Sequence, residues 1–215
     1  MFKRPDDRLQ KVVICSRVFP KFVFRRRKIS PGTTGLLIVA LVVVQAFPAA
    51  AQRGLAAQEG ILNFGKISES LYRGAQPDAA AITNLAKLGV KVIINLRMAD
   101  DIWKPEEALA QAHGILYTNI PLRGLGRPTD EQMKTILALL GASQGPVFVH
   151  CQHGCDRTGT VVACYRIQHD KWTSDDALKE AKRYGMSGFE RGMKRFVVDF
   201  GKSSTAERLA TTTGL

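Results

Sequence analysis

One short stretch, residues 146–168, constrains the fold of this chain more than any other. An apolar run from Pro146 to Val149 is followed by a polar loop, His150 to Gly159, and then by a run with helical character that reaches Gln168. The order strand, tight loop, helix brings the backbone N–H groups of the loop and the N-terminus of the helix together, where they can bind an anion. The sequence therefore predicts an anion site of phosphate size between a strand and a helix.

Two side chains of this loop supply chemistry to that site. Cys151 leaves the strand, and Arg157 opens the helix. The planar fork of an arginine can hold two phosphate oxygens. The positive field of the loop favours the cysteine thiolate, which is the form that attacks phosphorus. The alternative is a structural cysteine beside a helix-capping turn.

The remaining chain alternates β-branched apolar runs with helical patterns. Strands are expected over 90–96, 115–120 and 146–150, with an edge strand or turn within 64–73. Helices are expected after the capping residues Asp78, Thr129 and Thr173, over 105–113, and along an apolar face formed by Phe189, Met193, Phe196, Val197 and Phe200. This alternation predicts a single α/β domain whose central, mostly parallel sheet is flanked by helices, with the site at the carboxyl ends of the strands.

The amino-terminal 51 residues have the pattern of a secretory signal. A basic stretch ends at Lys28, an apolar core spans 35–47, and small residues from Pro48 to Ala51 form a cleavage site. We expect residues 52–63 to be a linker, 64–200 the catalytic domain and 201–215 a flexible tail. The protein is then exported, periplasmic or secreted, with no stable membrane insertion after cleavage. An inner-membrane anchor through residues 35–47 is the alternative, although that core is short for a spanning helix.

Charge and cysteine count narrow the class further. Residues 1–51 hold ten of the 31 Lys and Arg residues and two of the 19 Asp and Glu residues, which leaves 21 basic against 17 acidic residues in the body. This slight excess, without interleaved aromatics, excludes a general nucleic-acid binder. Without Cys15, which belongs to the signal, three cysteines remain, and an odd number is no disulfide framework. Cys155 is either a small loop filler or the partner of Cys151 in a reversible disulfide.

The loop residues His150, Cys151, Gly154, Arg157 and Thr158 resemble those of the cysteine-dependent protein tyrosine phosphatase superfamily. The similarity is greatest to its compact dual-specificity-like branch from bacteria, plants and fungi, and residues 71–77 and 94–97 also resemble segments of that branch. The resemblance implies that Cys151 forms a phosphocysteine, Arg157 binds the phosphate, Thr158 hydrogen-bonds the leaving sulfur and His150 holds the loop. It also implies that no metal or cofactor is needed and that the phosphate is lined by Gln152, His153, Gly154, Cys155, Asp156 and Arg157.

The general acid departs from the pattern of the branch. Relatives often carry an aspartate in the loop that here spans 122–128, and this loop contains no carboxylate. The candidates for the general acid are Asp156, inside the loop 150–159 (the phosphate loop), and Asp130, in the first turn of the helix that follows residues 122–128. Each also has a structural interpretation, since Asp156 can hold the shape of the loop and Asp130 can complement a helix dipole. Asp100, Asp101 or a substrate with a good leaving group remain alternatives.

These features lead to a functional hypothesis, a phosphatase of the protein tyrosine or dual-specificity type. Its partner is a phosphorylated protein or a small phosphorylated substrate, and we expect a monomer. An inositol polyphosphate or phosphoinositide phosphatase is the alternative, because Arg123 and Arg127 could bind additional phosphates. A non-catalytic phosphate-binding module and a thiol redox protein are the alternatives from other classes. At the edge of the loop, His153 either contacts the phosphate or faces solvent.

Overall fold

The computed structural model describes residues 54–213, with side chains as far as residue 206. The expected signal segment, its cleavage site and the alternative anchor lie outside the described residues. Within residues 54–213, no helix combines the length and the apolar character needed to cross a membrane.

A five-stranded sheet forms the centre of the domain. Its strands are β1 (Gly65–Ser68), β2 (Leu71–Gly74), β3 (Val92–Asn95), β4 (Leu116–Asn119) and β5 (Val147–His150). They are arranged in the order β1-β2-β5-β3-β4. Only the edge strand β1 is antiparallel to its neighbour, and every other pair is parallel. The prediction of a mostly parallel sheet is confirmed.

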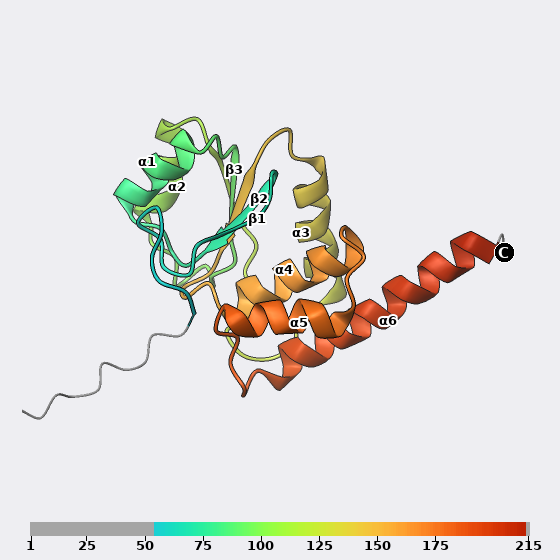
Figure 1. Ribbon diagram of the computed structural model, residues 1–215. Coiled ribbons are helices and arrows are strands. Elements are labelled where there is room, and N and C mark those ends of the chain that lie inside the picture. Colours follow the sequence, from blue (N-terminus) through green and yellow to red (C-terminus); the bar gives the residue numbers. More distant parts are fainter. Residues whose placement is uncertain (1–53, 214–215) are drawn as a thin grey trace, which may run out of the picture. The chain divides into compact units, whose positions relative to one another are not determined.

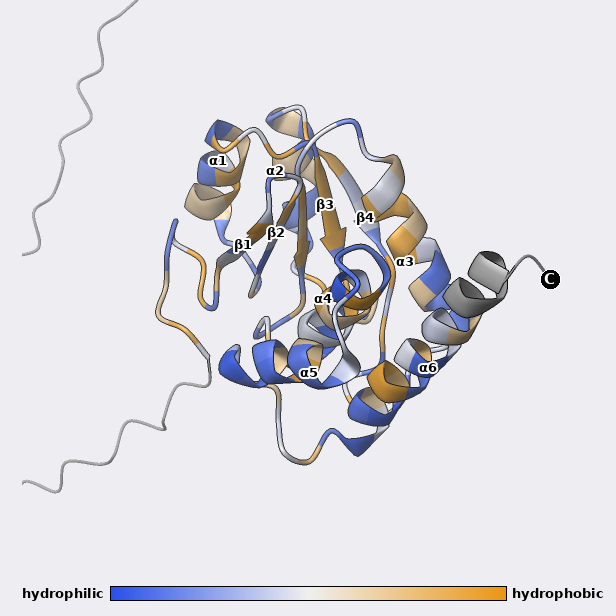
Figure 2. Ribbon diagram, turned by 45° about the vertical axis from the view of Figure 1, so that its right-hand side comes forward, coloured by the Kyte–Doolittle hydropathy of each residue, from blue (hydrophilic) through white to orange (hydrophobic). Residues whose placement is uncertain are grey.

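Helices cover both faces of the sheet (Figure 1). On one face lie α1 (Ala79–Lys87) and α2 (Pro105–Ala112). On the other lie α3 (Asp130–Ala142), α4 (Asp156–Gln168), α5 (Ser174–Arg183) and α6 (Arg191–Thr213). The hydrophobic strands lie between these two helical layers, and α5 carries mainly hydrophilic residues (Figure 2). α4 packs against α3, α5 and α6, so the helix that follows the phosphate loop is buried on most sides.

Capping residues begin the helices where the sequence predicts. The Asp78 carboxylate accepts a hydrogen bond from the N–H of Ala81 at 2.8 Å. Thr129 and Gln132 form the reciprocal capping box at the start of α3, with distances of 3.1 and 2.9 Å. The Thr173 hydroxyl accepts from the N–H of Asp176 at 3.2 Å. Each bond satisfies an N–H that the first turn of a helix leaves without a backbone partner.

Alternation along β5 divides the core into two clusters. Val147 and Val149 pack with α3, α4 and α6, whereas Phe148 packs with α1 and with Ile93 of β3. Successive side chains of a strand point to opposite faces, so His150 lies on the Phe148 side, where the two rings stack at 5.4 Å. The histidine that ends β5 is therefore directed toward the layer of α1 and α2.

Three segments differ from the expectations. Part of the expected linker is packed, because Ile61 is fully buried and Asn63 bonds to the phosphate loop. The expected tail from residue 201 continues α6 to Thr213. Phe189 was expected on the apolar face of the last helix, but it lies before α6 and is 88% exposed, while Met193, Phe196 and Val197 are buried. The helix begins two residues later, at Arg191, so Phe189 falls outside its apolar stripe.

Candidate active site

The carboxyl ends of four strands form one row that leads into the phosphate loop. Gly74, His150, Asn95 and Asn119 are register partners on neighbouring strands. The carbonyl of His150 accepts the N–H of Leu96 at 2.9 Å, so the sheet pairing extends to the last residue before Cys151. Cys151 therefore leaves the centre of the sheet, at the edge where parallel sheets place ligands.

The loop ends at the amino terminus of α4, where the cradle for an anion is open. Cys155 occupies the N-cap position and its side chain makes no capping hydrogen bond, so within residues 54–206 the first N–H groups of α4 are left for an anion. Arg157 is almost buried, and its Nη1 lies 3.5 Å from the carbonyl oxygen of Leu96. The Thr158 hydroxyl is buried and has no hydrogen-bond partner among residues 54–206. The structure thus brings Cys151, Arg157 and Thr158 to one loop and helix start.

Gly154 fixes the path of the loop. Its φ is +66°, and a Cβ atom built on it would lie 2.5 Å from the carbonyl carbon of Gly74. Only a glycine avoids both the steric cost of that conformation and the collision with the backbone of β2. Its carbonyl oxygen accepts from Asn63 Nδ2 at 3.0 Å and from Arg73 Nη2.

Arg73 places a buried positive charge behind the loop. Its guanidinium lies over the Tyr184 ring, 3.9 Å from the centroid, and the side chain is fully buried. Burial lowers the pKa of Arg73 to about 10, against the opposing influence of Tyr184 and Cys151. The side chain therefore remains a cation at neutral pH, close enough to act on the Cys151 sulfur electrostatically.

Asn63 ties the beginning of the domain to the same loop. Its Nδ2 approaches the Tyr184 carbonyl oxygen at 2.7 Å and the Cys155 sulfur at 3.4 Å, while its Oδ1 accepts the N–H of Leu55 at 2.9 Å. Its φ of +57° is a backbone conformation that asparagine tolerates better than most residues. Cys155 is a thiol in the structure, packed between Asn63 and the carbonyl of His153.

A buried polar network holds His150 from the α2 side. His150 Nε2 lies 2.8 Å from Glu106 Oε1, and both side chains are completely buried. The other carboxylate oxygen of Glu106 accepts from Asn95 Nδ2 at 2.8 Å, and the same amide lies 3.0 Å from the Tyr117 hydroxyl. Burial, and then the charge of Glu106, raise the pKa of Tyr117 to about 12. The network orients the imidazole and through it the backbone at Cys151.

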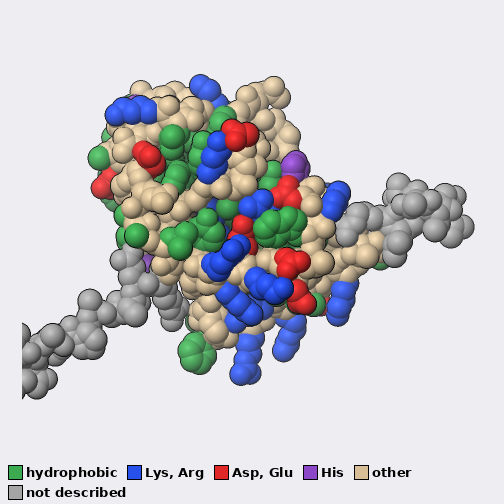
Figure 3. All heavy atoms as spheres, viewed as in Figure 1, with side chains coloured by type: hydrophobic (Ala, Val, Ile, Leu, Met, Phe, Trp, Pro, Cys, Tyr) green, Lys and Arg blue, Asp and Glu red, His purple; other side chains and the backbone are tan. Residues whose placement is uncertain are grey.

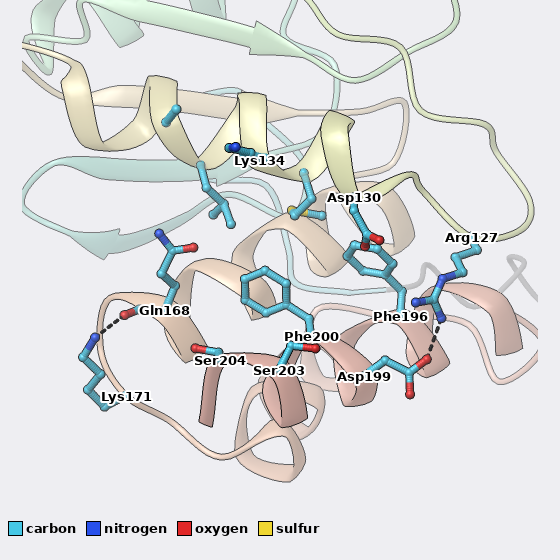
Figure 4. Close-up of a pocket in the computed structure, with 13 residues that line it drawn as sticks. Arg127, Asp130, Lys134, Gln168, Lys171, Phe196, Asp199, Phe200, Ser203 and Ser204 are labelled. Atoms are coloured by element: carbon cyan, nitrogen blue, oxygen red, sulfur yellow. Dashed lines mark hydrogen bonds and ion pairs between the residues drawn. The ribbon is translucent and has the colours of Figure 1, made fainter. Parts of the chain in front are cut away.

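The structure separates the candidate acids. Asp156 Oδ1 accepts the N–H of Ser187 at 2.6 Å, so this carboxylate fastens the segment before α6 to the phosphate loop. Asp130 lies in a groove between α3 and α6, near Phe196 and the Arg127–Asp199 ion pair (Figure 4). Cys151 is not among the residues that line this groove.

Asp101 occupies a different position, within the electrostatic range of Arg157 and His153. Its carboxylate accepts two hydrogen bonds from Arg97, at 2.8 and 3.2 Å. These bonds, chiefly, and the charges of Arg97, Arg157 and His153 hold the pKa of Asp101 below its usual value. A carboxyl group in this state is ionised at neutral pH, which opposes its use as a proton donor.

The remaining predicted residues lie around the loop. Gln152 and His153 are exposed, and the Gln152 carbonyl oxygen accepts the N–H of Gln76 at 3.3 Å. Arg123 lies beside Arg157 and Met193, around a gap too small to admit a water molecule. Arg127 is bound to Asp199 at 2.7 Å, on the α6 side. The two arginines of loop 122–128 therefore have different surroundings, and Arg123 is the one that borders Arg157.

Three residues that position the site were not identified from the sequence. Asn63 lies in the expected linker, and Glu106 has the pattern of an ordinary acid in the first turn of a helix. Arg73 lies in the stretch 71–77 that carries part of the resemblance, but the sequence assigned it no role. No local signal marks Glu106, because its burial depends on α2 packing over the end of β5.

Comparison with known proteins identifies the family. The sequence matches the family described as "DSP-PTPase phosphatase fused to NAD+ Kinase" over residues 46–199, which is more than half of the chain. The chain belongs to the DSP-PTPase phosphatase family. This membership confirms the resemblance inferred from the phosphate loop.

Individual members of the DSP-PTPase family are also similar. The dual specificity protein phosphatase TpbA of Pseudomonas aeruginosa is 35% identical over 133 residues, which cover 58% of this chain and 55% of TpbA. The chain thus spans about half the length of that relative. The crystal structure of a cysteine-to-serine variant of TpbA in complex with phosphotyrosine superposes with a TM-score of 0.58 and 26% identity, covering 73% of this chain and 98% of the other. Inositol diphosphatase DSP1 of rice is 26% identical and covers 66% of both chains.

Proposed function

We propose that this protein hydrolyses phosphomonoesters through a phosphocysteine at Cys151, with phosphotyrosine among its substrates. The observation that carries this proposal is the open N-terminus of α4, which stands between a cysteine at the end of β5 and the nearly buried Arg157. The similarity to TpbA, whose variant structure contains phosphotyrosine, supports this choice of substrate.

The residues suggest the roles in the reaction. The Cys151 thiolate attacks phosphorus, a P–S bond forms, and the bond to the leaving oxygen breaks. Arg157 and the loop N–H groups stabilise the charge on the three phosphoryl oxygens. Water then attacks the phosphocysteine, which releases inorganic phosphate and returns the electron pair to sulfur. Thr158, whose hydroxyl has no partner among residues 54–206, can donate a hydrogen bond to that sulfur.

A cysteine exchange tests this mechanism. Cys151→Ser should abolish turnover of para-nitrophenyl phosphate while binding of phosphotyrosine, measured by calorimetry, persists. The control is Cys164→Ala, because Cys164 is buried within α4 and burial raises the pKa of its thiol. Turnover that survives Cys151→Ser would refute the phosphocysteine.

A second candidate substrate class follows from the positions of the carboxylates that could donate a proton to the leaving group. Loop 122–128 contains no carboxylate, Asp156 is bound to Ser187, and Asp101 is paired with Arg97. An enzyme without a dedicated proton donor acts best on substrates whose leaving group is already a weak base, such as a phosphoanhydride. The similarity to a rice inositol diphosphatase supports this class, and Arg123 could bind an additional phosphate near Arg157.

The dependence of rate on the leaving group distinguishes the two classes. A series of aryl and alkyl phosphates should show kcat falling steeply as the pKa of the leaving group rises. The fall should be unchanged in Asp130→Asn and Asp101→Asn. If Asp156→Asn or Asp101→Asn slows only the substrates with poor leaving groups, that residue is the general acid and the preference for phosphoanhydrides is withdrawn.

A further inference from the structure

Two large apolar side chains project from the surface beside the active site. Leu125 is 77% exposed and Phe189 is 88% exposed. They are the most exposed large hydrophobic side chains among residues 54–206. Exposure of one such side chain is ordinary, so the case for a partner depends on their occurring together beside the active site.

The two side chains belong to adjacent loops that border the phosphate loop. A Cβ atom on Gly192 would lie 2.7 Å from the backbone of Gly126, so the start of α6 rests directly on loop 122–128. The loop that precedes α6, residues 184–190, is held to the phosphate loop by the hydrogen bond from the N–H of Ser187 to Asp156. Arg123 and Met193, one from each side, lie beside Arg157. Leu125 and Phe189 therefore project from the rim of the active site.

The same rim is positively charged. Residues 122–128 contain no acid. Residues 181–195 contain one acid, Glu190, and only 6% of it is exposed. Lys and Arg side chains gather over α5 and the beginning of α6 (Figure 3). The exposed basic residues of the two segments are Arg123, Lys182, Arg183, Arg191 and Arg195, together with Arg127, whose charge is paired with Asp199. A partner of this surface must combine negative charge with an apolar interior.

We propose that these two loops dock the domain on an anionic lipid bilayer, with Leu125 and Phe189 entering the interface and the basic residues contacting headgroups. Leu125 and Phe189 are 77% and 88% exposed and so extend away from the domain, which suits insertion among lipids. Each basic residue near an anionic surface adds to the attraction. Resting on the proposed phosphatase activity, the docked domain would act on phosphorylated lipid headgroups in the plane of that bilayer.

A tryptophan added at the tip reports docking when its emission is compared with that of the parent protein, which contains Trp103 and Trp172. In the full chain, the emission of Phe189→Trp should shift to the blue with equimolar phosphatidylcholine and phosphatidylglycerol vesicles. The shift should be absent with pure phosphatidylcholine and should reverse with added salt. The control is Leu116→Trp, because Leu116 is 71% exposed at the amino end of edge strand β4. No shift for Phe189→Trp, or an equal shift for Leu116→Trp, overturns the proposal.

Activity provides an independent measurement. Leu125→Ser with Phe189→Ser should lower the rate on phosphatidylinositol phosphate in those vesicles about tenfold, as expected from losing apolar burial, and leave the rate on soluble para-nitrophenyl phosphate unchanged. A loss on both substrates makes the loops structural, and a loss confined to phosphotyrosyl peptides makes them a peptide surface; either result overturns the proposal. Binding of the Cys151→Ser variant to vesicles requires no turnover. It therefore tests the docking proposal independently of the proposed phosphatase activity.

Discussion

The back and the rim of the phosphate loop are built in opposite ways. Behind the loop, Arg73 and Glu106 are completely buried, and each contacts polar groups of other segments. At the rim, Leu125 and Phe189 are exposed and Arg123 faces solvent. We expect the buried contacts to fix the conformation of the loop, and the exposed side chains to tolerate substitution without disturbing it.

This contrast assigns reaction type and substrate choice to different parts of the molecule. Substitutions behind the loop should change kcat on every substrate, because they displace Cys151 or Arg157. Substitutions at the rim should change which substrates are preferred. The ion pair between Arg166 and Asp170, at the far end of α4, should affect stability alone. It serves as a reference for the substitutions behind the loop and at the rim.

Among substitutions that keep Cys151, the largest effect is expected from Gly154→Ala. The new Cβ atom would meet the Gly74 carbonyl carbon at 2.5 Å and would have to adopt a φ of +66°. The free energy of unfolding should fall by about 2 to 4 kcal/mol, and kcat about a hundredfold as the loop shifts. Thermal denaturation and kinetics measure both. Gly188→Ala, which meets nothing within 4 Å, is the control; equal behaviour of the two variants would contradict a fixed loop.

A smaller effect is expected from Glu106→Gln behind the loop. The amide keeps the shape of the side chain but removes the carboxylate that faces His150 Nε2 at 2.8 Å. The value of kcat should fall about tenfold with KM nearly unchanged, because the histidine positions Cys151 and does not touch substrate. Glu107→Gln, in the exposed neighbouring position, should have no effect. A change confined to KM would show that this network acts on substrate binding instead.

At the rim, Arg123→Gln should discriminate between substrates. Arg123 is exposed and lies beside Arg157, so a second phosphate on a substrate held by Arg157 would be within its reach. KM for an inositol polyphosphate should rise about fivefold, the value of one solvent-exposed charge contact of about 1 kcal/mol. KM for para-nitrophenyl phosphate should stay the same. Arg127→Gln is the comparison, because Arg127 is engaged with Asp199; equal effects would remove the special role of Arg123.

The smallest effect is expected from Asp170→Asn, at the far end of α4. Burial alone would raise the pKa of Asp170, but hydrogen bonds from Arg166 and His169 outweigh it and hold this pKa below its ordinary value of 3.8. The stabilisation is therefore present above that value and disappears as the pH falls below it.

At pH 7 the Asp170→Asn variant should lose about 0.5 to 1 kcal/mol in urea unfolding, with kcat unchanged. Below pH 3.8 the difference from the parent protein should shrink. Glu59→Gln, in an exposed turn, is the control. A fall in kcat would mean that the far end of α4 is coupled to the phosphate loop.

Much of the architecture could be predicted because it depends on local patterns. An apolar, β-branched run such as 90–96 favours a buried strand whatever its neighbours are. Caps such as Asp78 and the Thr129–Gln132 box act within one helical turn. The phosphate loop is equally local, since its cysteine, glycine and arginine lie within seven consecutive residues. The strand order β1-β2-β5-β3-β4 was not predicted, because it depends on contacts between distant segments.

The sequence by itself determined the class of fold, and it predicted the position of the phosphate loop with Cys151 and Arg157 as its chemical groups. Only the tertiary structure decided what surrounds them. Asn63 and Arg73 reach Gly154 across more than 80 residues, and Glu106 reaches His150 across 44. Phe189, expected in the core, lies in solvent. The physical reason is that a side chain's type and spacing specify its local conformation, whereas its burial and partners depend on which distant segments pack against it.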